Sequence, residues 1–384
     1  MRIYDKEVHE QIFRKNVLYQ NIEKNIAKSV GSTTKYLSVH YGRNTGSAAM
    51  GETDSLPTAG FQQYLQGSVG MKYNFHQLSI TDVALTASRR SKEFLVDVLE
   101  SEYQGAKDDM KRQISRQFWG IGTGEICKVN GDPGAGTTLN LDTPMCGKNP
   151  TDYLEVNNVI RTGSTASTIA TISGITDGDT VTLSAAVAAI ADNDAVYIAQ
   201  SATQSNKDQE IMGLKGLIDD GTNVDTLEGF ARTTYFWWQS YIDDSSSSRA
   251  LTDSLMHTTF LEAMRKGEIG YILTSYDVYK AYGLLLTPDR RYTNSDNPLK
   301  GGFVGLVFND KPIVADYDCP FDEMYFMDNS VLSVEDLADM SFLQEDGAIL
   351  DRSSTTPAWN ATLKYYANLA IKAPNKCSAL RDVV

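Results

Sequence analysis

Histidine side chains are the first candidates for catalytic chemistry, because imidazole is the commonest general base near neutral pH. The chain has four of them: His9, His40, His76 and His257. Each falls within a helical or strand pattern, with no nucleophile or acid at a spacing typical of a catalytic pair. The sequence also contains neither a GxSxG nor an HExxH segment. No histidine is therefore expected to act as a general base.

Nucleotide and metal sites are not expected either. The glycine-rich residues 120–124 follow a helical segment and lack the Lys-Ser/Thr pair of a phosphate loop. Residues 177–179 and 192–194 carry oxygen ligands that suit calcium, but neither segment leads to the bidentate glutamate of an EF-hand, so both are expected to be β-turns. The cysteines show no CxxC spacing and are expected to be reduced and structural: Cys127, Cys146, Cys319 and Cys377.

An acidic cluster near the C-terminal third is the remaining candidate for catalysis. It consists of Asp316, Asp318, Asp322 and Glu323. Paired carboxylates are what a glycosidase uses, but Cys319-Pro320 interrupts the cluster, and a solvated loop is the preferred interpretation. We therefore assign no catalytic, cofactor-binding or metal-binding residue and expect no cofactor and no enzymatic activity.

The composition indicates a soluble protein with several structural units. The 384 residues include 49 Asp and Glu against 35 Lys and Arg, which gives a net charge of -14. Such an acidic surface argues against tight binding to phosphate backbones. The sequence has no apolar run of membrane-spanning length and no charged-then-apolar leader, so cytoplasmic synthesis and no membrane contact are expected.

The longest predicted element is a helix from Ser91 to Trp119, about 28 residues and roughly 42 Å long. It contains no proline, and its apolar residues recur at steps of three and four. The second half of this stripe comprises Tyr103, Ala106, Met110, Ile114 and Phe118. We interpret the helix as a strut with other layers laid across it. A long surface helix on an ordinary globular domain is the alternative.

Two alternating segments precede this helix, residues 35–42 and 68–76. They are predicted to be the two strands of one hairpin, with a polar, glycine-rich loop over residues 42–67 between them. A two-stranded hairpin is marginal in water, so we expect it to lie on a neighbouring copy of the same protein. Docking on its own domain is the alternative. Residues 1–34 read as a polar helical arm.

The rest of the chain predicts an α+β fold. Residues 120–207 become rich in Gly, Thr, Ser and Asp, which indicates an inserted β-barrel or sandwich that is either structural or a recognition module. A helix rich in aromatic residues is predicted around residues 235–241. Thr252 and Ser275 are predicted to cap two later helices, the second ending before Pro288. A second hairpin is predicted over residues 302–316 and a long closing strand over 363–371, so late residues must pair with early ones.

This order of parts resembles the tailed-bacteriophage major capsid protein of the Hong Kong 97-type fold. Residues 50–57, MGETDSLP, resemble that family's extended loop, and residues 91–119 resemble its spine helix. Residues 270–286 and 305–328 resemble the strand, helix and hairpin of its axial domain, and residues 360–383 its closing strand and tail. Residues 120–207 lie outside the resemblance.

The resemblance implies a structural virion protein that assembles as hexamers and pentamers into an icosahedral shell around double-stranded DNA. Its partners are then other copies of itself, a portal protein and, in some members, a decoration protein; DNA is contacted loosely and without sequence specificity. The family's best-known members carry a long cleaved N-terminal segment, whereas few residues precede the hairpin here. A separate scaffolding protein is therefore implied, or none.

The implied domains follow the same order: N-terminal arm 1–35, extended loop hairpin 36–78, spine helix of the peripheral domain 79–119, inserted β-module 120–207, axial α/β domain 208–345 and C-terminal return 346–384. Some members of the family join a loop lysine covalently to an asparagine of a neighbour. No lysine occurs between Tyr36 and Met71 here, so we expect a shell held by non-covalent contacts.

Two other functions stay open at this stage. An encapsulin-type nanocompartment shares the fold but encloses cargo enzymes, and it needs an apolar groove for a cargo peptide, which the sequence does not reveal. A carbohydrate-acting hydrolase with an appended β-module needs paired carboxylates in a cleft. The sequence does not give the triangulation number, the host, or the residues that contact DNA or portal.

Overall fold

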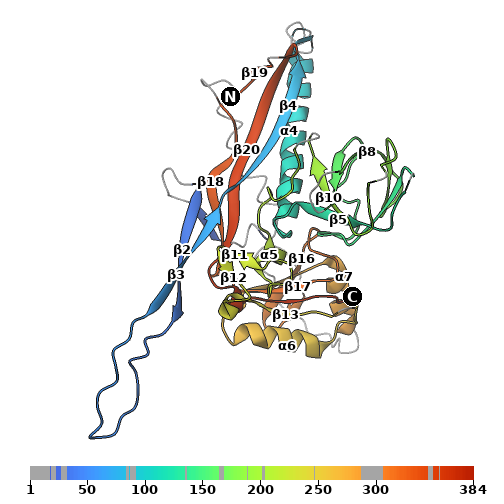
Figure 1. Cartoon of the computed structure of the whole chain (residues 1–384). Coiled ribbons are helices and arrows are strands. Elements are labelled where there is room, and N and C mark those ends of the chain that lie inside the picture. Colours follow the sequence, from blue (N-terminus) through green and yellow to red (C-terminus); the bar gives the residue numbers. More distant parts are fainter. Residues whose placement is uncertain are drawn as a thin grey trace, which may run out of the picture.

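Figure 1 shows the computed structural model of the chain. It describes residues 18, 23–26, 33–83, 86, 92–134, 136–163, 168–187, 189–200, 204–245, 247–286, 306–344, 349–353 and 355–384, without the side chains of 23–26 and 92–101. Most of the expected N-terminal arm, including His9, lies outside the described residues. No helix within them is long and apolar enough to cross a bilayer.

A long central strand, β20 (Ala358–Ile371), organises the upper part of the molecule (Figure 1). On one side it pairs antiparallel with β4 (Lys72–Thr81) along the whole of that strand. On the other it pairs with β18 (Leu332–Phe342), and two further strands complete the sheet: β1 (Glu23–Ile26) and β19 (Asp351–Arg352). The closing strand expected from the sequence thus pairs with residues almost 300 positions away.

Helix α4 (Lys92–Gln117) runs along this sheet (Figure 1). Its buried apolar side chains are spaced by four residues, as the apolar stripe predicts: Ala106, Met110 and Ile114, with Phe118 continuing the series directly after the helix. They share one hydrophobic core with the inward-facing side chains of β4 and β20, among them Leu78 and Leu363. The helix is stable because this stripe is buried, since isolated helices gain little from propensity alone.

The hairpin consists of β2 (Thr34–Gly42) and β3 (Gln63–Gly70), and its distal loop extends far from the rest of the chain (Figure 1). The sequence prediction was wrong about its second strand. Residues 72–76 belong to β4, because the chain changes its pairing partner after Met71. The backbone N–H of Met71 still donates to the Thr33 carbonyl at the start of β2, whereas Lys72 pairs with β20. The strict alternation of residues 69–75 hides this change, since both strands have the same period.

Residues 125–199 form a closed six-stranded barrel beside α4 (Figure 1). Its strands are β5 (Glu125–Val129), β6 (Thr138–Asp142), β7 (Val159–Thr162), β8 (Thr168–Ile175), β9 (Thr180–Leu183) and β10 (Ala195–Ala199). The interior is filled by its own apolar cluster, including Leu139, Ile160 and Val196. The two ends of the segment meet, since a Cβ on Gly124 would lie 2.3 Å from the Asn206 carbonyl oxygen.

The lower unit is a mixed six-stranded sheet with helices packed on it. Its strands, in spatial order, are β13 (Tyr241–Asp243), β21 (Ser378–Leu380), β17 (Met324–Met327), β14 (Tyr271–Thr274), β16 (Lys311–Ala315) and β15 (Val307–Phe308). Helices α6 (Asp253–Met264) and α7 (Tyr276–Leu285) share a second core with it. The predicted caps are confirmed, since Thr252 and Ser275 accept hydrogen bonds from the first-turn N–H groups of Leu255 and Val278.

Two local predictions were wrong. Residues 23–26 of the expected helical arm are strand β1, which pairs parallel with the edge of β18. The aromatic segment near 235–241 forms only the short 3-10 turn η1 (Phe236–Trp238), close to α5 (Leu214–Leu217). A buried guanidinium explains this irregular backbone, because Arg232 donates to the carbonyls of residues 216, 217, 224 and 238, which therefore need no helical partners.

The α4 stripe yields a stability prediction. We expect Met110→Ala to lower the free energy of unfolding by about 2–4 kcal/mol, because the side chain is 1% exposed and its loss leaves a cavity against the sheet. Asp109→Ala, on the exposed side of the same turn, is the matched control and should change it by less than about 0.5 kcal/mol. Urea denaturation followed by circular dichroism measures both, and equal midpoints for the two variants would contradict this packing.

Candidate assembly surfaces

The base of the hairpin rests on its own chain, which corrects the expectation that it has no internal support. Leu37 and Val69 bury against Ala370 of β20. The ring of Tyr41 stacks on Trp237 with centroids 5.5 Å apart. Near the short hairpin of β11 (Thr226–Leu227) and β12 (Phe230–Ala231), Gly67 lies so close to Phe230 that a Cβ would come within 2.7 Å of its ring.

The distal part of the hairpin has no such support. Between residues 43 and 62 the two backbones still run close together, since a Cβ on Gly46 would lie 3.0 Å from the Thr58 carbonyl oxygen. The apolar side chains there face solvent: Leu56 is 90% exposed and Phe61 is 87% exposed. Exposed apolar side chains on an element that no other described element covers are typical of an interaction surface.

A second exposed apolar group lies on the sheet face opposite α4. Tyr73 and Phe75 of β4 lie opposite Tyr366 and Lys364 of β20. The rings of Tyr73 and Phe75 meet Tyr366 edge-on at 5.0 and 5.5 Å, and the Lys364 ammonium lies 5.7 Å from the Tyr366 ring. These side chains contact one another across the strands, and Phe75 remains 55% exposed.

Three acids of the cluster, Asp316, Asp318 and Glu323, are buried where three units meet, so the interpretation of the cluster as a solvated loop was wrong. Asp318 accepts hydrogen bonds from Ser115 of α4 and from Tyr153 of the barrel segment. Burial and the Asp318 carboxylate raise the pKa of Asp316 to about 6. Arg116 and Glu210 form a buried ion pair beside this junction. The barrel segment is thus fixed to both α4 and the lower unit.

Glu323 completes a second buried network. It forms an ion pair with Lys215 at 2.7 Å and accepts a hydrogen bond from Tyr325. Burial alone would raise the pKa of Glu323, but the cations of Lys215 and Arg381 outweigh it and hold the pKa below its ordinary value. Arg381 also reaches Asp219 at 3.1 Å. The carboxylates of Glu323 and Asp219 are therefore partners of buried cations, and this pairing holds both carboxylates in their ionised form.

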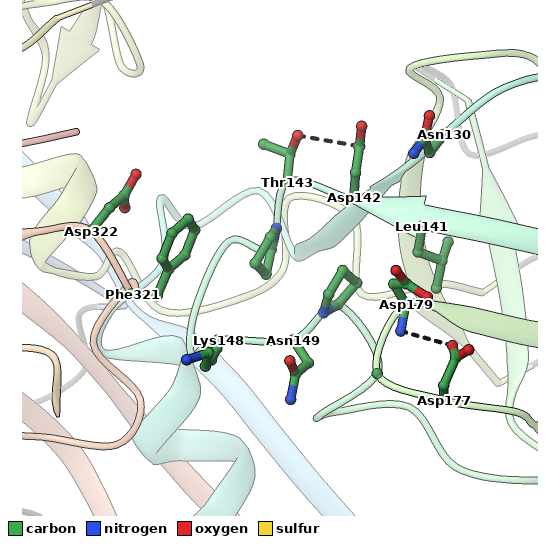
Figure 2. A pocket seen from close by; sticks show the side chains of 13 residues that line it. Asn130, Leu141, Asp142, Thr143, Lys148, Asn149, Asp177, Asp179, Phe321 and Asp322 are labelled. Carbon is green, nitrogen blue, oxygen red and sulfur yellow. Dashed lines mark hydrogen bonds between the residues drawn. The ribbon is translucent and has the colours of Figure 1, made fainter. Parts of the chain in front are cut away.

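A cleft of about 800 Å³ lies between the barrel and the 321–322 loop (Figure 2). Its lining residues are Asn130, Leu141, Asp142, Thr143, Pro144, Lys148, Asn149, Pro150, Asp177, Gly178, Asp179, Phe321 and Asp322. Several of its carboxylates have local donors, since Asp177 accepts from the Asp179 N–H and Asp142 from the Thr143 hydroxyl. Within the described residues, no group of three or more His, Cys, Asp or Glu is arranged to hold a metal ion.

The three described histidines lie on three different elements, β2, β4 and α6. His40 contacts Gln62 and the Tyr64 ring on the hairpin, while His257 lies 3.5 Å from Asp253 on α6 and against Phe308. His76 is half-buried in β4. All four cysteines are buried and unpaired. Burial, first of all, raises the pKa of the Cys146 thiol to about 12, which leaves it protonated and unreactive.

No model of a protein family matches the sequence, and no curated protein does. Among solved structures, the capsid asymmetric unit of cyanophage A-1(L) aligns over 96% of this chain and 93% of that chain, with 13% identity and a TM-score of 0.59. The capsid protein of an empty GTA particle aligns over 96% and 90%, with 10% identity and a TM-score of 0.51.

The chain has the fold of a phage capsid protein. The same comparison finds the holo-SrpI encapsulin complex from Synechococcus elongatus PCC 7942, with 8% identity over 97% of this chain and 89% of that chain and a TM-score of 0.50. The capsid fold is a mixed α+β architecture, as the sequence predicts.

Sequence reasoning missed the buried charges that fix this capsid fold. Arg116, Glu210, Arg232 and Arg381 look like surface residues in the sequence, and their partners lie between 13 and 162 positions away. The only local signal was the density of acids at residues 316–323, which read equally well as a solvated loop. Charge pairs across such separations leave no periodic pattern.

The Arg116–Glu210 pair yields a second prediction. We expect Glu210→Gln to lower the free energy of unfolding by about 3–5 kcal/mol, because it leaves the buried Arg116 guanidinium without a counter-charge. The control is Glu155→Gln, which breaks the exposed Arg112–Glu155 pair of the same helix face and should change stability little. Thermal and urea unfolding measure both variants. Equal losses would mean that the buried pair contributes no more than a surface one.

Proposed function

We propose that this protein is a major capsid protein of a tailed bacteriophage, a structural and non-enzymatic virion component. Copies of the chain assemble as hexamers and pentamers into an icosahedral shell around double-stranded DNA. The capsid fold supports the proposal, and so does the exposed tip of the hairpin. Its anchored base and uncovered apolar tip fit an arm that holds a neighbouring subunit.

The anchored base is the observation that carries the proposal. A flexible loop that binds a partner loses conformational entropy on binding, which weakens the contact. Here the strands β2 and β3 are held by Tyr41, Gly67 and Val69, so both ends of the distal loop are fixed in place and the ordering cost of the tip is lowered. Leu56 and Phe61 then supply apolar area that a neighbouring copy can bury, at about 25 cal/mol per Å².

We infer that the fold is of the Hong Kong 97 type and that the chain divides as the sequence indicates. The proposed units are the arm 1–35, the extended loop 36–78, the spine helix region 79–119, the β-module 120–207, the axial domain 208–345 and the return 346–384. Helix α4 takes the part of the spine helix. The barrel is an addition whose role we leave open between structural support and recognition.

The proposed partners follow from the shell. A portal protein and a separate scaffolding protein are proposed in addition to other copies of the chain, and the sequence leaves open whether a decoration protein joins them. A net charge of -14 suits a wall that holds packaged DNA without binding it tightly. Synthesis in the host cytoplasm precedes assembly into the virion.

An encapsulin-type compartment is the second candidate, supported by the likeness to the SrpI complex. The contents of purified particles separate the two. Particles from infected cells that contain DNA protected from nuclease agree with the capsid proposal, whereas particles that co-purify with one stoichiometric cargo enzyme and no DNA agree with the compartment.

The hairpin tip gives the decisive experiment. We expect replacement of residues 43–62 by Asn-Gly, which joins the paired residues Gly42 and Gln63, to leave a folded subunit that no longer closes shells. The base retains its contacts, while the apolar side chains that bind a neighbour are gone. Circular dichroism reports folding, and negative-stain electron microscopy counts closed particles.

A milder variant tests the same surface, and a third variant serves as its matched control. Leu56→Ser with Phe61→Ser keeps the length of the loop and removes only its apolar surface, so it should lower the yield of particles without preventing subunit folding. Thr58→Ser alters the same loop without removing apolar side chains and should assemble normally. Closed particles at wild-type yield from the truncated hairpin would sink the idea that it joins subunits.

The lack of lysine between Tyr36 and Met71 gives another prediction. Covalent joining of a lysine to a neighbouring amide needs an amine that can lose its proton, and Arg43 cannot replace it because its guanidinium stays protonated. Lys35 lies at the hairpin base and is already paired with the buried Glu335. Mature particles boiled in detergent and reductant should therefore run as a single band near the 42.3 kDa of the monomer. A ladder of covalent multimers is the contrary result.

A further inference from the structure

Glu228 occupies an unusual position beside the hairpin base. It is the first residue of the two-residue turn that joins β11 and β12, and both turn residues have left-handed backbones, with φ of 55° at Glu228 and 90° at Gly229. Such turns favour Asn, Asp or Gly. A glutamate there adopts a strained backbone, so its side chain is expected to make contacts that offset the strain.

Those contacts join two elements of the fold. The backbone carbonyl of Glu228 accepts a hydrogen bond from the Ser68 N–H of β3 at 2.8 Å. Its side-chain Oε1 accepts one from the N–H of Ile371, the last residue of β20, also at 2.8 Å. One residue therefore connects the base of the hairpin to the end of the central strand.

The environment of the carboxyl group favours its neutral form. The other carboxyl oxygen, Oε2, is buried and has no hydrogen-bond partner. Burial raises the pKa of Glu228 to about 8, although the Ile371 N–H and the Arg232 guanidinium act to lower it, and the nearby Glu335 carboxylate acts to raise it. Both charged neighbours have partners of their own, since Arg232 is paired with Asp219 and Glu335 with Lys35 of β2.

We propose that Glu228 is a proton-controlled latch for the hairpin. With a proton on its carboxyl group, Glu228 fits its buried site and holds the base of β2 and β3 against the end of β20. Loss of the proton leaves a charged carboxylate in a buried site. Water can solvate this charge when the β11–β12 turn moves away. The N–H groups of Ser68 and Ile371 then lose their acceptors. The consequence for shell closure rests on the proposed function; the latch itself does not.

The sign of the pH dependence follows from the two states. In the closed latch the group titrates near pH 8, and in the open, solvated latch near its ordinary value of 4.5. The closed state thus binds the proton more tightly, so closure is fully favoured below about pH 4.5 and weakens as the pH rises toward 8. Between pH 6 and pH 8 the closing equilibrium should fall about 50-fold.

Hydrogen exchange on the isolated subunit tests the latch directly. The protection factors of the Ser68 and Ile371 amides, corrected for the intrinsic pH dependence of exchange, should fall about 50-fold between pH 6 and pH 8 in the wild type. Glu228→Gln keeps an acceptor for Ile371 and has no proton to lose, so its protection factors should stay constant over this range. Glu155→Gln, at an exposed carboxylate of the barrel segment, is the control and should follow the wild type.

An assembly assay provides the second test. Wild-type subunits should close shells at pH 6 more completely than at pH 9, and Glu228→Gln should close them equally at both. A flat wild-type exchange profile overturns the latch whether or not the variant folds, and identical pH profiles of the wild type and Glu228→Gln overturn it as well. Absence of shells at every pH, with the exchange difference intact, contradicts the proposed function and leaves the latch standing.

Discussion

The pairing of β20 with β4 and β18 is the interaction on which the rest of the structure depends. Over its 14 residues, β20 contributes one face to the core beneath α4. It pairs on one side with β4, from the first quarter of the chain, and on the other with β18, from the last quarter. Asn368 extends this role beyond the sheet, because its side chain donates to the Gly70 carbonyl at 2.7 Å and accepts from the Met212 N–H at 3.0 Å. The hairpin and the segment that returns from the barrel are therefore positioned by the same strand.

Buried charges play a different part. A buried ion pair gains little net stability over well-packed apolar residues, because desolvation of both ions nearly cancels their attraction. Its geometric requirement is strict, however, since each partner left alone is costly. The pairs at Arg116, Lys215 and Arg381 join residues 210–219, which follow the barrel, to α4 and to residues beside strands β17 and β21 of the lower sheet. We infer that they fix the relative placement of these parts of the chain.

The sequence was informative wherever a pattern repeats locally. The apolar stripe of α4, the caps at Thr252 and Ser275 and the alternation of β20 all follow from periodicities of 3.6 or 2, or from a side chain bonding its own helix. It failed where a choice depends on distant residues. The change of partner at Met71 and the burial of Asp318 depend on residues far along the chain, and nothing near Met71 or Asp318 indicates them.

The late position of β20 has a consequence for the order of events during synthesis. The ribosome makes the chain from the N-terminus, so the barrel at residues 125–199 has all its strands well before residue 371 emerges. Until then β4 lacks its partner, α4 lacks half of its core, and the hairpin has no Ala370 to rest against. A nascent chain therefore does not yet hold the hairpin in its final place. In the proposed shell, chain order alone then disfavours association on the polysome, because only completed subunits carry a correctly held hairpin.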